Sequence, residues 1–517
     1  MDKIDEVKNE YSKFRDSDFR EHQKDAIEYI VNSKKKIVTA CLPTGAGKSL
    51  IGTVSAGVIG VGTYLVHSKT LQVQLQDDFS ELPILWGRNN YKCLRSENSL
   101  TCADCTHGEA SLCPNKASRC EYVVAKRLAL NSTLRILNYE YWITEANYVG
   151  GFGNEEFIVV DEADSLESVM AKFINLEFTD GMMKNLRIDY PKYKTTSSAK
   201  SLDEWRMWAS MAELQVAKRL RSIVSDINNN DADPELLRRK EKLSGILRKL
   251  KIFQECVDET WLYEEKEYDG RKSISFKPTW VTRELAEKYV WSHGAKFVLM
   301  SATFPPIPVL AKTLGINISD IDYREFPSTF PAENRPVILK PVANMVYKDM
   351  EVESAKAIKE IKVLLEAHRD EKGLIHTVSY KLRDMVMAIG DPRLVTHNGA
   401  NKISAIDDFK ASDKPLVMVS PSSERGISLD GEMCRWIVFL KAPYLNLSDK
   451  LVNARLYRSP VGSLWYKSNM LMSVVQGCGR GVRSINDKCV SYILDSQVVK
   501  AITENPTLVP YWFREAC

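Results

Sequence analysis

The chain has 517 residues, enough for three or four domains, and with 44% hydrophobic and 27% charged residues its composition is that of a globular protein. Its net charge is only +3, so the electrostatic field of the whole protein is too weak to indicate nucleic-acid binding. Evidence for such a function has to come from local sites. The amino terminus, MDKIDEVKNE, is charged from its second residue and excludes a secretory signal. We therefore expect a cytoplasmic protein that binds no membrane, whose eleven cysteines are metal ligands or free thiols rather than disulfides.

The first predicted element is a phosphate-binding loop at residues 37–49, IVTACLPTGAGKS. An apolar run predicts a strand, and after it come Thr44, Gly45, Ala46, Gly47, Lys48 and Ser49, with a helix expected to begin at Lys48. Such a loop turns its N–H groups toward a phosphate, and the helix N-terminus adds positive dipole character. Lys48 is expected to reach the β- and γ-phosphates of ATP, and Ser49 to bind Mg²⁺. Leu42 stands where the strict pattern has glycine, so a plain glycine-rich turn is the alternative.

The uncharged stretch from Leu50 to Val66 follows directly and is nearly long enough to cross a bilayer. It contains four glycines and begins inside the phosphate-binding motif. These features favour a buried helix followed by a buried strand over a membrane span.

Five of the eleven cysteines lie in one polar segment: Cys93, Cys102, Cys105, Cys113 and Cys120. A segment with so little apolar material needs another source of folding energy, which a bound metal supplies. Spacing alone does not separate zinc from a four-cysteine iron–sulfur cluster, and the short Cys102–Cys105 interval is typical of zinc. Free thiols are the alternative without a metal.

Residues 157–164, FIVVDEAD, predict a buried strand with Asp161 and Glu162 at its end. Ligands of α/β sheets bind at the carboxyl ends of parallel strands. Asp161 is expected to hold Mg²⁺, and Glu162 to orient and deprotonate the attacking water. An acidic cap of the next helix is the simpler alternative. Together with the phosphate-binding loop, this motif predicts a nucleotide hydrolase.

About 130 residues between Asp164 and Lys296 carry no further motif of this kind. Apolar residues at helical spacing predict two helices, one through Leu214, Ala217, Leu220, Val224 and Ile227, the other through Leu236, Leu243, Leu247 and Leu250. Between them Asp233 is expected to cap the second helix and Pro234 to begin it. The result is a helical hairpin rich in Arg and Lys, for which a solvated scaffold is the alternative.

The chain after residue 295 contains several units of a buried strand followed by a polar loop. They are KFVLMSAT at 296–303, GLIHTVS at 373–379 and LVMVSPSSERGIS at 416–428, the last with Glu424 and Gly426. VQGCGRGVR at 475–483 then carries Gln476, Arg480 and Arg483, whose spacing places them on one face if the segment is helical. Arginines aimed at a γ-phosphate stabilise charge in the transition state. The alternative is a basic solvated helix.

These motifs, in this order, resemble those of superfamily 2 helicases: motif I at Pro43–Ser49, motif II at Asp161–Asp164, motif III at Ser301–Thr303, motif V at Glu424–Ser428 and motif VI at Gln476–Arg483. QGCGRGVR followed by YILD resembles the XPD/DinG branch, as do FREHQ at 19–23, GRNNYKC ending at Cys93, CEYVVAK from Cys120 and LNYEYW at 137–142. The resemblance spans nearly the whole chain.

The resemblance implies an α/β fold of two RecA-like P-loop motor domains with an inserted iron–sulfur domain and an inserted helical arch domain. The first motor domain is expected at residues 1–88, 123–165 and 276–325, the iron–sulfur domain at 89–122, the arch at 166–275 and the second motor domain at 326–517. Gln23, Glu424 and Gly426 are expected to join the ATP site. A [4Fe–4S] cluster is expected on Cys93, Cys105, Cys113 and Cys120, with Cys102 as the alternative to Cys105.

The implied function is an ATP- and Mg²⁺-dependent DNA helicase, a monomer that moves 5′→3′ on single-stranded DNA and unwinds tailed or forked duplexes with a loading protein of unknown identity. One alternative is a translocase or remodeller that does not separate strands. Another is a nucleic-acid-binding regulatory module whose ATP site is a switch, but Glu162, Arg480 and Arg483 argue against it, because a switch does not need them.

Overall fold

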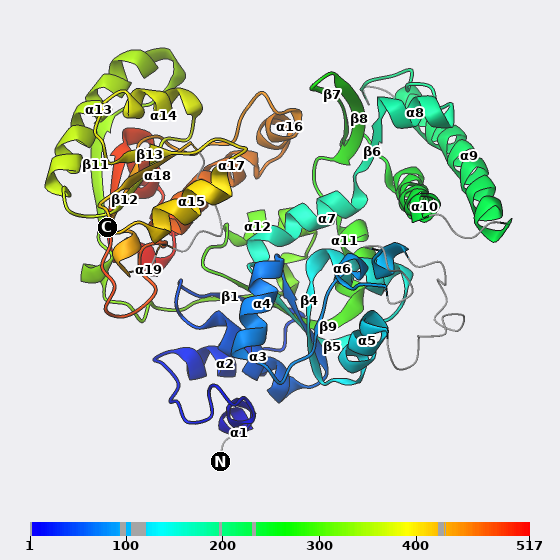
Figure 1. The fold of residues 1–517 in the computed structure, drawn as a ribbon, viewed down its shortest axis with the longest axis horizontal. Coiled ribbons are helices and arrows are strands. Elements are labelled where there is room, and N and C mark those ends of the chain that lie inside the picture. Colours follow the sequence, from blue (N-terminus) through cyan, green and yellow to red (C-terminus); the bar gives the residue numbers. More distant parts are fainter. Residues whose placement is uncertain are drawn as a thin grey trace.

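A computed structural model describes residues 3–93, 100–104, 120–195, 199–229, 234–421, 429 and 431–517. Two parallel sheets, each flanked by helices, form the body of the molecule, and a helical insert projects from the first of them (Figure 1). The α/β class and the division into two parallel-sheet domains are as predicted. No helix among the described residues is long and apolar enough to span a bilayer.

The first domain is built on a seven-stranded parallel sheet. Its strands, in spatial order, are β10 (Ile321–Glu325), β1 (Ile37–Cys41), β9 (Gly294–Ser301), β5 (Glu155–Asp161), β2 (Gly62–Val66), β4 (Leu134–Asn138) and β3 (Ile84–Leu85). Its helices are α1 (Lys3–Glu10), α2 (Gln23–Asn32), α3 (Lys48–Ile59), α4 (Lys69–Asp78), α5 (Glu121–Asn131), α6 (Tyr139–Tyr148), α7 (Leu166–Ile174), α11 (Arg283–Tyr289) and α12 (Ile307–Leu314). The stretch from Leu50 to Val66 forms most of α3 and all of β2, which confirms a buried helix and strand.

Strand β5 shows why its sequence is a continuous apolar run. Phe157 and Val159 lie in the core on one face of the sheet, while Ile158 and Val160 lie in the core on the other. All four are at most 1% exposed, because helices cover both faces. The apolar run ends at Val160. Asp161 is the last residue of the strand, so Asp161 and Glu162 lie at the carboxyl edge of the sheet.

The second domain has a six-stranded parallel sheet. Its strands, in spatial order, are β11 (Val337–Ala343), β16 (Val490–Asp495), β15 (Trp436–Phe439), β12 (Gly373–His376), β14 (Val417–Ser420) and β13 (Leu394–Thr396). Its helices are α13 (Met350–Ala367), α14 (Tyr380–Met387), α15 (Lys402–Ala411), α16 (Lys450–Arg458), α17 (Gly462–Cys478), α18 (Ser496–Glu504) and α19 (Tyr511–Arg514).

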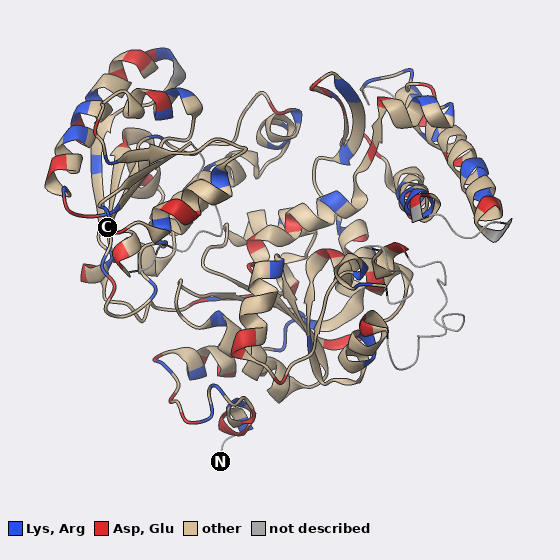
Figure 2. Cartoon of the chain, in the orientation of Figure 1, with Lys and Arg blue, Asp and Glu red and all other residues tan. Residues whose placement is uncertain are grey.

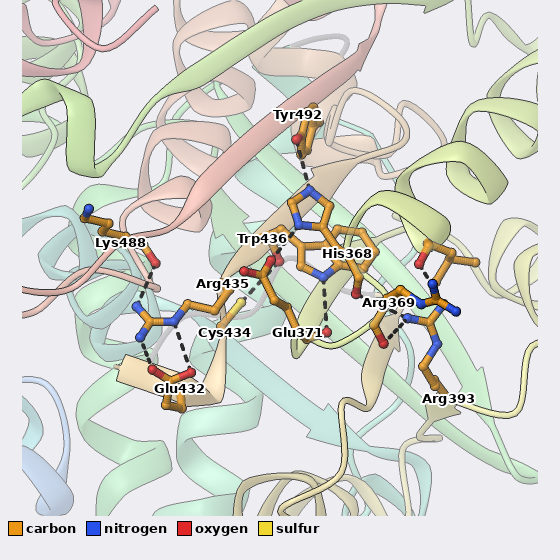
Figure 3. A network of polar contacts seen from close by, with 11 residues as sticks. His368, Arg369, Glu371, Arg393, Glu432, Cys434, Arg435, Trp436, Lys488 and Tyr492 are labelled. Atoms are coloured by element: carbon orange, nitrogen blue, oxygen red, sulfur yellow. Dashed lines mark hydrogen bonds and ion pairs between the residues drawn. The ribbon is translucent and has the colours of Figure 1, made fainter.

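A polar network secures the amino-terminal edge of this second sheet (Figure 3). The His368 ring stacks on Trp436 with centroids 5.1 Å apart, and its Nε2 lies 3.0 Å from the Tyr492 hydroxyl. Its Nδ1 lies 2.6 Å from Glu371 Oε2. These contacts join the end of α13 to β15 and β16 at the edge away from the carboxyl ends of the strands, so we assign them to stability.

The insert after motif II consists of a small antiparallel sheet and a long helical hairpin. The sheet has the order β6 (Leu176–Thr179), β8 (Arg271–Pro278) and β7 (Trp261–Tyr268), and the helices are α8 (Asp180–Leu186), α9 (Ala199–Asn229) and α10 (Pro234–Cys256). Pro234 begins α10 as expected, whereas Asp233 lies outside the described residues. The aromatic core of the insert consists of Trp205 in α9, Phe253 in α10 and Phe276 in β8. These rings pack the helical hairpin against the small sheet.

The hairpin also touches the cysteine-rich segment. Arg238 of α10 donates through Nε to Oδ1 of Asp104, two residues after Cys102, at 2.7 Å. This contact lowers the pKa of Asp104 to about 2, since the guanidinium stabilises the carboxylate. The insert and the cysteine-rich segment therefore meet at a charged contact.

Candidate active site

The phosphate-binding loop joins β1 to α3 as predicted, and α3 begins at Lys48. Gly45 and Gly47 have φ angles of +81° and +79°, which residues with a side chain rarely adopt. A Cβ on Gly45 would also lie 2.3 Å from the ring of Phe330. The fold therefore requires glycine at both positions, and the missing glycine at Leu42 does not prevent the loop from forming.

Asp161 and Glu162 reach the same edge of the sheet from β5, two strands from β1 in the sheet order. Lys48 Nζ lies 3.6 Å from Glu162 Oε1, so the candidate phosphate ligand and the candidate base face each other. Burial, together with the neighbouring Glu162, raises the pKa of Asp161 to about 6, and Lys48 opposes the shift. Glu162 has a φ of +54°, an unfavourable backbone conformation of the kind found at functional sites.

Tyr64 lies close to the two side chains predicted to bind Mg²⁺. Its hydroxyl donates to Asp161 Oδ2 at 3.0 Å, and burial raises the pKa of Tyr64 well above its usual value, a shift that the nearby Ser49 opposes. A hydroxyl and a carboxylate are hard oxygen donors of the kind that Mg²⁺ prefers. Tyr64 is completely buried in β2, and its sequence position gives no sign of this contact, because an aromatic residue in a buried strand looks like an ordinary core residue.

The second domain reaches this site through Gln476, near the end of α17. Its amide donates to Asp164 Oδ2 at 3.2 Å and to Thr303 Oγ1 at 3.0 Å. Ser301 Oγ donates to Asp164 Oδ1 at 3.2 Å. Motifs II, III and VI thus meet at one point, and one glutamine of the second domain contacts two loops of the first.

One expectation about motif VI is wrong. Helix α17 ends at Cys478, so Arg480 and Arg483 lie in the turn after it and do not share a helix face with Gln476. The segment turns away because it packs closely: a Cβ on Gly481 would lie 2.3 Å from Cys489 Sγ. The turn still approaches the phosphate-binding loop, since a Cβ on Gly45 would lie 3.5 Å from the carbonyl oxygen of Arg483. Arg480 is 6% exposed.

Gln23 contacts the phosphate-binding loop itself. Its Nε2 donates to the carbonyl of Ala46 at 2.9 Å, and its Oε1 accepts from the backbone N–H of Arg20 at 2.9 Å. Arg20 in turn donates to the carbonyl of Gly45 at 3.1 Å. In this arrangement Gln23 supports the shape of the loop. A small, mainly apolar pocket next to the loop is lined by Pro43, Thr44, Phe330, Cys478, Gly479 and Val482.

Several predicted site residues lie outside the described part of the chain: Glu424, Gly426, Cys105 and Cys113. Of the cysteine-rich segment, Cys93, Cys102 and Cys120 are described. Cys102 Sγ lies 3.9 Å from Sγ of Cys120, the last cysteine of the segment. Within the described residues, no three His, Cys, Asp or Glu side chains form a group that could hold a metal ion.

A phosphate-binding loop and an acidic pair lie on one parallel sheet and are met by a glutamine from a second sheet, which is the arrangement of a two-domain P-loop protein. Residues 353–516 match the family model of the helicase C-terminal domain. The structure resembles one named XPD_Helicase with a TM-score of 0.59 and 16% identity, over 96% of this chain and 98% of that one. It also resembles XPD_APO with a TM-score of 0.57 and 17% identity, over 95% and 97% of the two chains.

The Xpd4 structure from S. tokodaii gives a TM-score of 0.59 at 14% identity, over 96% of this chain and 99% of that one. No curated protein sequence matches the chain significantly. The fold of the whole chain is therefore that of the XPD structures, and the match to the helicase C-terminal domain covers the second parallel-sheet domain. These likenesses do not distinguish the DinG branch from XPD.

Proposed function

We propose that this protein is an ATP-driven DNA helicase of the DinG branch, which moves 5′→3′ along single-stranded DNA and separates the strands of a duplex. The observation that carries the proposal is the contact of Gln476 with Asp164 and Thr303. A motor needs its second domain to sense the nucleotide held by the first, and this contact reaches from one domain into the acidic motif of the other. DNA as the substrate and the direction of movement rest on the sequence resemblance.

In this proposal each side chain of the ATP site has one role. Lys48 holds the β- and γ-phosphates, Ser49 and Asp161 hold Mg²⁺, and Glu162 activates the attacking water. Gln476, Arg480 and Arg483 act on the γ-phosphate from the second domain, and the sequence resemblance implies that Glu424 and Gly426 also bind the nucleotide. Thr44, Gly45, Ala46 and Gly47 present their backbone N–H groups to the phosphates, and Gln23 keeps their loop in shape.

The insert is the proposed arch over single-stranded DNA. Helix α10 carries seven basic and three acidic residues, so its local charge is strongly positive although that of the whole chain is small. In the cartoon of Figure 2, positions of Lys and Arg are coloured blue along α9 and α10. Because phosphates attract such surfaces without reading sequence, the hairpin fits a strand of any sequence.

We propose a metal group in the cysteine-rich segment and place Cys102 among its ligands, ahead of Cys105. The reason is the 3.9 Å contact between Cys102 Sγ and Cys120 Sγ. The sequence resemblance implies a [4Fe–4S] cluster, with Cys93, Cys105 and Cys113 as the other thiols from which ligands are drawn. Two thiolates of one tetrahedral zinc ion also lie roughly 3.8 Å apart, given Zn–S bonds of about 2.3 Å. Zinc is therefore the specific alternative.

Removing a metal ligand should uncouple ATP hydrolysis from unwinding. Cys102→Ser and Cys120→Ser are expected to lose the metal and the fold of the surrounding segment, while β1 and β5 keep the ATP site. Each variant should retain DNA-stimulated ATP hydrolysis but fail to unwind a 5′-tailed duplex. Iron and zinc are measured in protein purified without oxygen, and Cys517→Ser, at an exposed thiol of the second domain, is the control.

Brown wild-type protein that contains iron is the expected result. Colourless anaerobic protein with stoichiometric zinc would overturn the cluster assignment, and a full metal content in Cys102→Ser would remove Cys102 from the ligand set.

A translocase that strips bound proteins without separating strands is the alternative function, because the same ATP site drives both. Two substrates distinguish them: a tailed DNA duplex, and a single strand carrying streptavidin at its end. The proposed helicase releases the annealed strand in an ATP-dependent way. Displacement of streptavidin without any strand release would establish the alternative.

A further inference from the structure

The two motor domains meet a second time, away from the ATP site, at the root of the insert. Helices α16 and α17 of the second domain lie beside the segment where β7 and β8 return to the first domain (Figure 1). Lys450 Nζ, at the start of α16, lies 3.5 Å from the carbonyl oxygen of Tyr263 in β7. The insert is therefore attached to the first domain by its chain and to the second by side chains.

Arg455 is the centre of this contact. It is 7% exposed, and its Nη2 lies 2.6 Å from Glu167 Oε1 of α7. Its Nε donates to the carbonyl oxygen of Thr279, just after β8, at 2.7 Å. One guanidinium thus binds two segments of the first domain, at the entry to the insert and at the exit from it. The contact with Glu167 is an ion pair, and the contact with Thr279 is a hydrogen bond from the planar guanidinium.

Two tryptophans enclose the Arg455 guanidinium. It lies 4.5 Å from the ring centre of Trp280 and 5.3 Å from that of Trp465. The two rings meet edge to face with centroids 5.6 Å apart, and Val309 of α12 packs against them. The indole faces attract the cation and exclude water from its ion pair, which strengthens the attraction to Glu167.

Short rigid elements connect both sides of this contact to the ATP site. Glu167 lies three residues after Asp164, the carboxylate that accepts from Gln476. Trp465 and Gln476 lie on the same helix, α17, separated by about three turns, or about 16 Å. Helix α16 is packed tightly on α17, since a Cβ on Gly462 would lie 2.2 Å from the carbonyl oxygen of Arg455. Movement of α17 at the ATP site therefore moves Arg455 as well.

We propose that Arg455 couples the nucleotide-dependent movement of the second motor domain to the insert, so that the arch follows that domain. This inference rests on the proposed function for its purpose, but the coupling itself is a property of the contact. A buried ion pair is a poor source of net stability compared with apolar packing, whereas it holds two surfaces in one orientation. Arg455 is thus a positioning residue that acts on DNA through the insert and does not touch ATP.

The test uses two conservative variants and a matched control in the full-length protein. Arg455→Lys keeps the charge but loses the planar fork, and Glu167→Gln removes the carboxylate charge with little change in shape. Arg458→Lys is the control, because Arg458 is exposed at the end of the same helix. Strand release per ATP hydrolysed should fall by roughly tenfold in both variants, a typical coupling between sites, with DNA-stimulated hydrolysis within about twofold of wild type.

A distance measurement gives a readout that loss of stability does not imitate. Dyes introduced with unnatural amino acids at Leu214 on α9 and Val73 on α4, both exposed, report the distance from the insert to the first domain. A non-hydrolysable ATP analogue should change energy transfer in the wild type and in Arg458→Lys, but not in Arg455→Lys or Glu167→Gln.

Unchanged energy-transfer responses in both variants, with wild-type strand release per ATP, would overturn the proposal. If the wild-type protein releases no strand at all, the helicase proposal fails, and the energy-transfer experiment still decides whether Arg455 couples the domains. Thermal melting of each variant identifies one that does not fold, in which case the other carries the test.

Discussion

Lys48→Ala should abolish ATP hydrolysis, and Glu162→Gln should bind ATP but not turn it over. The lysine is expected to neutralise the phosphates in the ground state and in the transition state, so its loss removes both binding and rate. Glu162 is placed at the end of β5 within 3.6 Å of Lys48, where its carboxylate can take a proton from water. General bases contribute about 10²–10⁴-fold to rate, which is the loss expected for the glutamine variant.

Phosphate release and the binding of a fluorescent ATP analogue measure the two effects separately. Glu156→Gln is the matched control, since Glu156 lies on the same strand but is exposed. It should hydrolyse ATP like the wild type. Near-normal hydrolysis by Glu162→Gln would show that another group activates the water.

Arg480→Ala and Arg483→Ala should each slow DNA-stimulated ATP hydrolysis by on the order of 10³-fold, as loss of an arginine finger does in other phosphoryl-transfer enzymes. ATP affinity should fall much less, because the charge they stabilise develops only in the transition state. The turn that contains both arginines lies against the phosphate-binding loop, because a Cβ added to Gly45 would be 3.5 Å from the carbonyl oxygen of Arg483.

Single-turnover hydrolysis at saturating ATP separates the rate from binding. Arg369→Ala is the control, an exposed arginine of the same domain next to His368 in the network of Figure 3. Because Arg480 is buried, melting temperatures are compared first. If both arginine variants keep the wild-type rate, the second domain does not complete the ATP site.

The elements that the sequence predicted well are those determined by local patterns. The apolar run at 157–160 became β5 because both faces of a parallel sheet are buried, and the glycines of motif I placed the loop and the start of α3. The spacing of apolar residues likewise predicted the hairpin of α9 and α10. In each case the deciding residues lie within a few turns or one strand of one another.

Features that depend on distant contacts were missed. Three-residue spacing suggested that Arg480 and Arg483 lie on one helix face, but α17 ends at Cys478 because Gly481 has to pack against Cys489. The role of Tyr64 depends on a carboxylate 97 residues away. Arg455 in α16 contacts Glu167 and Thr279, which both lie more than 170 residues earlier in the chain, and its proposed role depends on these contacts. No pattern within one segment of the sequence indicates such pairs.

The most direct test of the proposed function is one strand-release experiment with four substrates: a DNA duplex with a 5′ tail, the same duplex with a 3′ tail, a blunt DNA duplex and a 5′-tailed RNA duplex. Wild-type protein with ATP and Mg²⁺ should release the strand from the 5′-tailed DNA duplex and leave the other three intact, and Glu162→Gln should release none. Release from 3′-tailed DNA alone would contradict the proposed direction of movement, and release from the RNA duplex alone would contradict DNA as the substrate. If none of the four duplexes releases a strand in an ATP-dependent way, the protein is not a helicase.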